Sequence, residues 1–313
     1  MLKKVIKTGL LFFLFLAVLL LELMLLNNVL IRKETAGVQD SFRKLKKDSV
    51  KTVFIGNSHQ YCSIDPDLLY EEYGLETFML ATAGQTVPMS YYAVLEAIEF
   101  QHPERIIFEA SYCANDFRTI SPEMSHYFFD KMPNCKARDL ALNDLIGRKN
   151  AINYLIPLGT YHGRWKELTQ QDFSNDAVSK RGGVHYENVV WNDEIKVLDS
   201  EETAPMPEEM EKYLDLLVAT CKEQGIELII YVAPFNSLYG DDENMLEDLY
   251  ARERIFNYVG EYCWEKDIEF HNLFFELDEI GLDGGTDWMD RQHLNCNGQA
   301  KFTRYMADRG YVR

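Results

Sequence analysis

The sequence contains no Cys-x-x-Cys pair, no glycine-rich phosphate-binding loop and no spacing of cysteine and histidine that suits zinc. We therefore expect neither a metal site nor a bound cofactor. The six cysteines are either free or buried thiols, or one or two disulfides form in an exported domain; the sequence leaves both open. The residues concerned are Cys62, Cys113, Cys135, Cys221, Cys263 and Cys296.

Positive charge is also scarce: 32 lysines and arginines stand against 50 aspartates and glutamates, a formal net charge of −18. A field of this sign repels phosphate groups, which argues against nucleic acid as a partner. It argues, less strongly, against a polyanion such as a teichoic acid and for a neutral glycan. With 313 residues, 47% of them hydrophobic, the chain can bury one substantial core.

A long apolar run is present near the amino terminus. Residues 9–26 are interrupted only by Glu22, and residues 27–31 extend the run to Arg32 and Lys33. A helix of this length, at about 1.5 Å per residue, spans a hydrocarbon core of ~30 Å. A cleaved signal peptide is the alternative, but no small-residue cleavage site follows Glu22, so residues 1–33 are predicted to be an uncleaved transmembrane anchor. Basic residues flank both ends and leave the orientation open.

The remaining chain divides into a polar stalk, residues 34–49, and a domain, residues 50–313. Apolar runs bounded by turn residues predict strands at 50–55, 76–80, 105–110, 226–233 and 268–273. Helical spacing and capping residues predict one helix that begins at Asp65-Pro66. They predict four more at 87–100, 208–224, 243–266 and 297–309. This alternation predicts an α/β fold, a flavodoxin-like three-layer αβα sandwich around a parallel five-stranded sheet. Residues 117–207 lack the alternation and are predicted to be an aromatic-rich insertion.

Reactive side chains follow the predicted strand ends. Ser58 comes directly after the first strand, in Gly56-Asn57-Ser58-His59, and His293 lies in the long loop after the fifth. Ligands of parallel sheets bind at the carboxyl ends of the strands, so we expect these groups on one rim. A serine hydroxyl needs a neighbouring base to act as a nucleophile, and we assign that base to His293. Asp290, three residues before it, would orient the imidazole; Asp287 is the other candidate.

Residues 53–59 and 287–295 resemble the first and last signature blocks of the SGNH (GDSL-like) hydrolase superfamily. There, a serine after the first strand is paired with Asp-x-x-His just ahead of the last helix, as Ser58 and Asp290-Arg291-Gln292-His293 are here. The Gly-Asn-Ser-His form and the apolar run look most like the membrane-anchored bacterial proteins that transfer acyl groups to cell-surface polysaccharides. The resemblance covers about 50–120 and 208–310.

The resemblance implies an oxyanion hole made by the backbone N–H groups of Ser58 and Gly84 and the side-chain amide of Asn115. Gly84 has a second interpretation, a tight turn that requires positive φ. Asn115 has one too, as a turn residue only, because Cys113 stands where the family commonly has a glycine.

Four residues are candidates for substrate binding. Asn57 and His59 flank the nucleophile and either contact substrate or shape the turn through local hydrogen bonds. Tyr161 and Trp165, in the insertion, either stack on sugar rings or hold the insertion together.

We therefore predict a membrane-anchored, extracytoplasmic serine acyltransferase or esterase acting on O-acyl groups, above all O-acetyl groups, of a cell-surface polysaccharide. Transfer and hydrolysis use the same residues, so the sequence does not separate them. A membrane-bound O-acyltransferase is the partner that would deliver acyl groups, and Glu22, costly inside a bilayer, is a point at which a partner could shelter a charge. The alternative from another class is a non-catalytic glycan-binding accessory protein.

Overall fold

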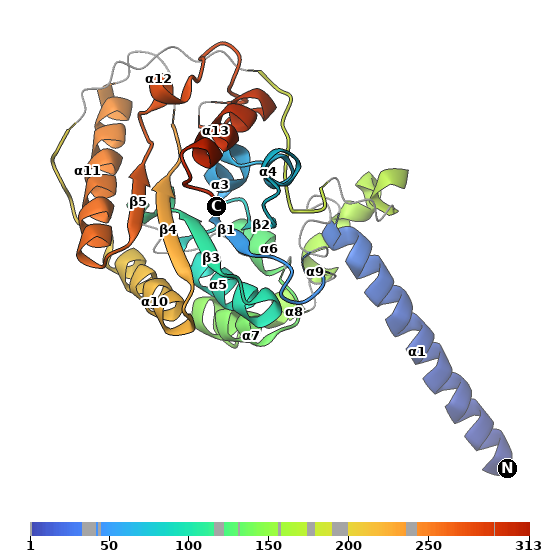
Figure 1. Cartoon of the computed structure of the whole chain (residues 1–313). Coiled ribbons are helices and arrows are strands. Elements are labelled where there is room, and N and C mark those ends of the chain that lie inside the picture. The colour runs from blue at the N-terminus through green and yellow to red at the C-terminus, as the bar shows by residue number, and fades with distance from the viewer. Residues whose placement is uncertain are drawn as a thin grey trace.

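The computed structural model describes residues 2–32, 42, 45–115, 122–130, 132–155, 158–173, 179–189, 200–235, 243–290 and 292–313. Most of the predicted stalk, residues 34–49, and Arg291 of the second motif lie outside these ranges. An apolar helix precedes an α/β domain, as predicted from the sequence (Figure 1).

The first helix, α1 (Leu2–Arg32), projects from the domain (Figure 1). Its apolar part, Ile6–Asn27, has 22 residues, about 33 Å at 1.5 Å per residue, and none of it is buried. Length and composition are those of a membrane anchor, and a signal sequence has the same properties.

The sheet has five parallel strands in the order β2-β1-β3-β4-β5. Every strand predicted from the sequence is present, with ends within two residues of those expected. Because growth of the sheet changes direction between β1 and β3, the carboxyl ends of these two strands border the crevice in which such folds bind ligands. The strands are β1 (Thr52–Gly56), β2 (Thr77–Ala81), β3 (Arg105–Glu109), β4 (Glu227–Val232) and β5 (Glu269–Asn272).

Alternate residues of the strands supply two separate cores. In β1, Val53 and Ile55 join the core beneath α5, α10 and α11, whereas Phe54 joins the core beneath α4 and α13. Helices therefore cover both faces and make three layers (Figure 1). Their bounds are α3 (Ser58–Ser63), α4 (Pro66–Tyr73), α5 (Val87–Gln101), α10 (Glu208–Gln224), α11 (Glu243–Glu265), α12 (Leu277–Ile280) and α13 (Cys296–Asp308).

Helix ends follow their capping residues. The Asp65 carboxylate accepts the N–H groups of Asp67 and Leu68 at the start of α4, as its place before Pro66 predicts. Helix α10 ends at Gly225, which adopts φ 68° in the left-handed region. Ser58 differs from expectation: it begins a short helix, α3, where the sequence suggested only a turn.

Between β3 and α10 the described chain forms only short helical segments. Helix α1 is contacted by α9, η3 and η4, and α7 contacts α5. Residues 179–189 return along the edge of the sheet, where Met79 N–H donates to the Arg181 carbonyl at 2.9 Å. The segments are η1 (Ser111–Ala114), α6 (Pro122–Phe129), α7 (Lys136–Ala141), η2 (Leu142–Ile146), α8 (Ile152–Leu155), α9 (Leu158–Tyr161), η3 (His162–Glu167) and η4 (Gln170–Phe173).

All six cysteines are free thiols, and five of them are buried. The sequence left open whether the cysteines are thiols or form disulfides, and in the structure they are thiols. Burial raises the pKa of the Cys62 and Cys113 thiols well above the usual value, which keeps them protonated and unreactive.

We predict that Gly298→Ala destabilises the domain by about 1 to 3 kcal/mol, because the close approach of α13 to the preceding loop leaves no room for a side chain. A Cβ at Gly298 would lie 2.3 Å from the Asp287 carbonyl oxygen and 2.9 Å from Leu294 Cδ2. Denaturant unfolding of the detergent-solubilised protein measures the change. Gly159→Ala is the control, since nothing lies within 4 Å of its Cβ. Equal stability of the two variants would contradict the prediction.

Candidate active site

Ser58 stands at the carboxyl end of β1, as the first residue of α3. Asn57 caps this helix: its side-chain oxygen accepts the backbone N–H of His59 at 2.7 Å. The cap fixes the turn from strand into helix, so the position of the Ser58 hydroxyl is set by the end of a central strand.

His293 is carried by a closed loop between β5 and α13. Trp288, fully buried, and Leu294 form an isolated antiparallel bridge across the base of the loop. Asn295 closes it from the other side by capping α13 and by donating to the Thr286 carbonyl at 2.8 Å. The loop therefore places Asp290 and His293 at its tip.

The structure brings Ser58, His293 and Asp290 together. His293 Nε2 lies 2.7 Å from Ser58 Oγ, although the two residues are 235 positions apart. His293 Nδ1 lies 2.8 Å from Asp290 Oδ2. An activated serine nucleophile requires this arrangement, in which a hydroxyl contacts an imidazole and the imidazole contacts a carboxylate.

Asp290, and not Asp287, holds the imidazole. Burial alone would raise the pKa of Asp290, but hydrogen bonds from His293 and from the Gln292 backbone N–H hold that pKa below its usual value. The carboxyl is therefore ionised and able to stabilise an imidazolium. The Asp287 carboxylate is buried and accepts Lys301 Nζ at 2.6 Å and Asp283 N–H at 2.7 Å, so it is engaged elsewhere.

His59 lies beside His293, with ring centroids 4.9 Å apart in a stacked arrangement, and Phe235 lies on it at 5.5 Å. The side chain is only 5% exposed. Burial above all, and next the like charge that a protonated His293 would place beside it, lower the pKa of His59 to about 3. The ring stays neutral at ordinary pH and supports the plane of His293 without competing for its proton.

A buried carboxylate, Glu109, underlies the serine turn from the end of β3. Its Oε2 accepts Ser111 Oγ at 2.7 Å and Asn57 Nδ2 at 3.2 Å, and its Oε1 accepts the backbone N–H groups of Ser111 at 3.0 Å and Ala233 at 3.2 Å. The network joins β1, β3 and β4. No local sequence pattern marks this network, because the pairing of Asn57 with Glu109 depends on neighbouring strands.

Asn57 is therefore part of the support beneath the site. Its side chain is fully buried and bonded to Glu109 and Ser111, so it does not reach a substrate. Of the two sequence interpretations, the local one fits Asn57. His59 is nearly buried as well, and its ring contacts are with protein side chains.

The three expected oxyanion donors have no described acceptor. Ser58 N–H belongs to the first residue of α3, where a helix has no internal acceptor. Within the described ranges, no hydrogen bond is donated by the Gly84 N–H or by Asn115 Nδ2 either. Gly84 has φ 65°, and a Cβ there would lie 2.3 Å from Met124 Sδ. This turn therefore requires glycine, whether or not the Gly84 N–H also binds an oxyanion.

Arg252, from α11, orients the Asn115 amide. Its Nη1 donates to Asn115 Oδ1 at 2.8 Å, which turns the amide nitrogen of Asn115 away from Arg252. Arg252 Nε donates to Asp248 Oδ2 at 2.9 Å, so the guanidinium is held at two points. Its charge also reaches His59 and Tyr112. No sequence motif marks Arg252, and only the packing of α11 beside η1 reveals it.

Tyr161 and Trp165 belong to a different part of the molecule. Tyr161 is 8% exposed and its hydroxyl donates to Asp130, so it joins α9 to the residue that follows α6. Trp165 lies in η3, which contacts α1. Figure 1 shows this region beside the end of α1 and apart from α3. The predicted contact of both residues with a substrate at Ser58 does not fit this placement.

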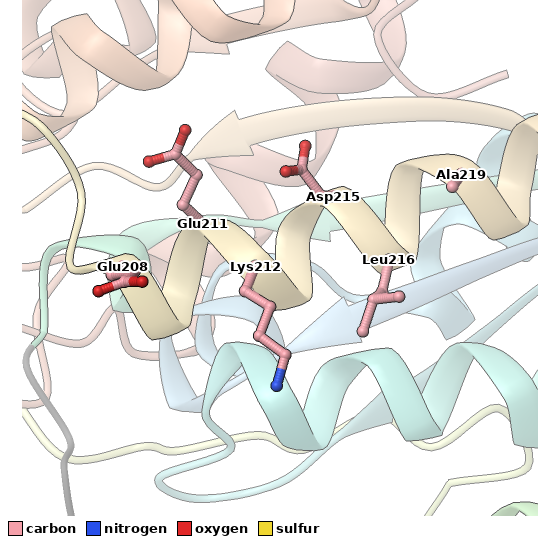
Figure 2. Close-up of a pocket in the computed structure, with 6 residues that line it drawn as sticks. All are labelled: Glu208, Glu211, Lys212, Asp215, Leu216 and Ala219. Carbon is pink, nitrogen blue, oxygen red and sulfur yellow. The ribbon is translucent and has the colours of Figure 1, made fainter.

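A groove on the exposed face of α10 offers no second binding site. It is lined by residues of that helix alone (Figure 2). Two of its acids, Glu211 and Asp215, accept the hydroxyls of Tyr258 and Tyr262 and so join α10 to α11. Its lining consists of Glu208, Glu211, Lys212, Asp215, Leu216 and Ala219.

Asp65, Asp67 and His185 form the one cluster of potential metal ligands in the ranges that the structure describes. Asp65 caps α4, and Asp67 accepts Ser179 Oγ at 2.5 Å and pairs with Arg181. Protein donors already occupy these carboxylates, so we assign no metal.

Comparison with known proteins yields likenesses of structure only. No protein-family model matches the sequence, and no curated protein matches it. Among solved structures, a catalytic mutant of an acetylxylan esterase from Geobacillus stearothermophilus is similar, with 15% identity and a TM-score of 0.41 over 86% of this chain and 98% of that one. A protein described as lipolytic and of the G-D-S-L family, from Desulfitobacterium hafniense, has 12% identity and a TM-score of 0.39 over 83% and 98%.

A third similar structure is described as an acylhydrolase from Bacteroides fragilis, with 12% identity and a TM-score of 0.39 over 90% of this chain and 98% of that one. At this level a likeness concerns the course of the backbone. The chemistry has to be inferred from the side chains of this chain.

We predict that Glu109→Gln removes a pH dependence of stability. Burial raises the pKa of Glu109 to about 7, although hydrogen bonds from Ser111, Ala233 and Asn57 oppose the shift. In the unfolded chain this carboxyl has its ordinary pKa of 4.5 and releases the proton near that pH. The free energy of unfolding therefore falls between pH 4.5 and pH 7 and is flat above pH 7. The difference between wild type and variant should therefore fall by roughly 3 kcal/mol from about pH 4.5 to about pH 8. Parallel denaturant titrations measure it; an unchanged difference would contradict the prediction.

We predict that Arg252→Ala lowers kcat for ester turnover roughly 10- to 100-fold with little change in KM, because the Asn115 amide loses its orientation. Arg254→Ala is the matched control: its side chain is 28% exposed against 29% for Arg252, but it contacts Glu247 and Glu202. Arg252→Lys should rescue only in part, since lysine lacks the fork. Equal losses in the Arg252 and Arg254 variants would show a merely structural effect.

Proposed function

We propose that this chain is an SGNH-like serine esterase or O-acyltransferase, anchored in a membrane by α1 and acting outside the cytoplasm on O-acyl groups of a cell-surface polysaccharide. The observation that carries the chemistry is the 2.7 Å contact between Ser58 Oγ and His293 Nε2, with Asp290 2.8 Å behind the imidazole. The geometry fits nucleophilic acyl chemistry and needs no metal.

The reaction follows from these positions. Ser58 Oγ attacks the ester carbonyl carbon while its proton passes to His293 Nε2, and Asp290 stabilises the imidazolium. The tetrahedral intermediate collapses, the carbon–oxygen bond to the alcohol breaks, and His293 returns the proton to the leaving oxygen. Ser58 then carries the acyl group as an ester. Water or an acceptor hydroxyl attacks the acyl carbon and gives a proton to His293. The bond from the acyl carbon to Ser58 Oγ then breaks, and His293 Nε2 returns the proton to Ser58 Oγ.

The oxyanion that forms during both attacks requires fixed donors. We assign them to the N–H groups of Ser58 and Gly84 and to Asn115 Nδ2. Support comes from the absence of any described acceptor for these groups and from the Arg252 contact that sets the Asn115 amide. Because Asn115 Nδ2 is already oriented, the amide does not have to move when negative charge develops on the substrate oxygen.

The membrane part of the proposal is supported by the carboxyl-terminal end of α1. Leu30 is only 1% exposed, and Arg164 Nη1 donates to its carbonyl at 3.1 Å. A cleaved signal peptide has no reason to be built into the domain, whereas an anchor that stays attached does. The net charge of −18 favours a neutral glycan as substrate over a polyanion.

Transfer and hydrolysis differ only in the acceptor of the second step. A membrane-bound O-acyltransferase partner, delivering acyl groups through the bilayer, would make this chain a transferase. Incubation with an acetylated oligosaccharide and a second, unacetylated one separates the two: transfer gives acetylated acceptor, hydrolysis gives free acetate.

We predict that Ser58→Ala lowers kcat on a chromogenic acetyl ester by a factor on the order of 10⁴ or more, because it removes the nucleophile. The full chain in detergent micelles is assayed, and a serine-reactive phosphonate should label wild type at Ser58 and leave the variant unlabelled. Ser63→Ala, at the other end of α3, is the control and should keep its activity. Full activity of Ser58→Ala would reject Ser58 as the nucleophile. An unlabelled and inactive wild type would reject the enzyme and leave the glycan-binding accessory protein.

A further inference from the structure

The carboxyl-terminal end of α1 is held by the insertion. Helix α1 contacts α9, η3 and η4, and its end lies beside α9 in Figure 1. The Arg164 guanidinium donates to the Leu30 carbonyl. Arg164 also lies over the Tyr161 ring at 3.8 Å, which ties the contact to α9. The insertion and the end of α1 therefore form one structural unit.

This contact fixes the depth of the insertion if α1 spans a bilayer. The apolar part of α1 ends at Asn27, and Leu30 is three residues further, about 4.5 Å along the axis. Headgroup layers extend roughly 5 to 7 Å beyond the hydrocarbon core on each side. The elements that hold Leu30 consequently stand at the level of the headgroups.

The same region exposes apolar side chains. Outside α1, nine large hydrophobic side chains are exposed in the described part of the chain, and five of them fall between residues 140 and 173. Trp165 is 60% and Phe173 63% exposed, which is unusual for aromatic side chains in water. The five are Leu140, Ile152, Leu155, Trp165 and Phe173.

The net charge of this region is positive, whereas that of the whole protein is negative. Residues 140–173 contain four basic and three acidic side chains, a local charge of +1 in a chain of −18. Lys166 lies 5.8 Å from the Trp165 ring centroid. Aromatic and basic side chains together at the end of a spanning helix are typical of a bilayer interface, where the rings sit among the headgroups and the cations meet lipid phosphates.

We propose that residues 140–173 form a membrane-docking surface that lies in the headgroup layer around the end of α1, with Trp165 and Phe173 inserted among the lipids. This rests on the anchoring part of the proposed function and does not depend on its chemistry. The two contacts act together: α1 sets the depth and the surface prevents rotation about the helix axis. A bilayer is favoured over a protein partner because the exposed Trp165 and Phe173 belong to η3 and η4, which contact α1 where it must leave the lipid.

The full chain, reconstituted in vesicles of phosphatidylcholine and phosphatidylglycerol whose phosphatidylcholine carries bromine on its acyl chains, tests this through tryptophan quenching. Bromine quenches only nearby indoles, so wild-type emission should fall relative to unbrominated vesicles, and Trp165→Phe should lose most of that lipid-dependent quenching. Trp264→Phe is the matched control: Trp264 is 83% exposed but belongs to α11, remote from α1 in Figure 1, and its removal should leave the quenching intact.

Each outcome is decisive. Protein that floats with the vesicles but shows the same quenching in wild type and Trp165→Phe would overturn the docking surface while leaving the anchor, as expected if a protein partner covers this face instead. Failure to float would overturn both. Esterase activity, measured on the same samples, reports the proposed chemistry separately, because Trp165→Phe leaves Ser58 and its partners untouched.

Discussion

Burial of Trp288 is the constraint on which the candidate site depends. Ser58 is fixed by a central strand, but His293 lies in a loop that could adopt many conformations without a point of attachment. The fully buried indole, the bridge from Trp288 to Leu294 and the Asn295 cap attach that loop to α13 and the sheet. Hydrophobic burial in one core thereby sets a hydrogen-bond distance at the rim. Catalytic geometry and domain stability are in this way properties of the same contacts.

The support beneath Ser58 is polar, in contrast to the apolar support beneath His293. Glu109 collects donors from three strands at the cost of burying a carboxyl group, which its raised pKa reflects. Such a network tolerates few substitutions, because any lost partner leaves a buried polar group unsatisfied. It also gives a fixed direction to the Asn57 cap. A cap bonded only to its own helix would leave the serine turn free to shift.

Most of the fold and part of the site could be predicted from the sequence. Strand ends and the caps at Asp65 and Gly225 follow from local patterns, and Ser58 and His293 follow from their places after strands. Glu109 and Arg252 could not be found in this way, because their partners come from register and helix packing. The sequence leaves two interpretations open for Asn57, Tyr161 and Trp165 for a related reason: it shows that a side chain is aromatic or adjacent to the serine, but not which surface the fold gives it.

The direction in which α1 leaves the domain has a consequence for what can reach the serine. Figure 1 shows the helix running away from the end of the sheet where α3 begins. In a membrane, the mouth of the site would then open toward the surroundings and stand clear of the lipid. Acyl chains of the protein's own bilayer would be out of range, whereas a flexible polymer extending from the cell surface could thread its decorated units past the rim one after another.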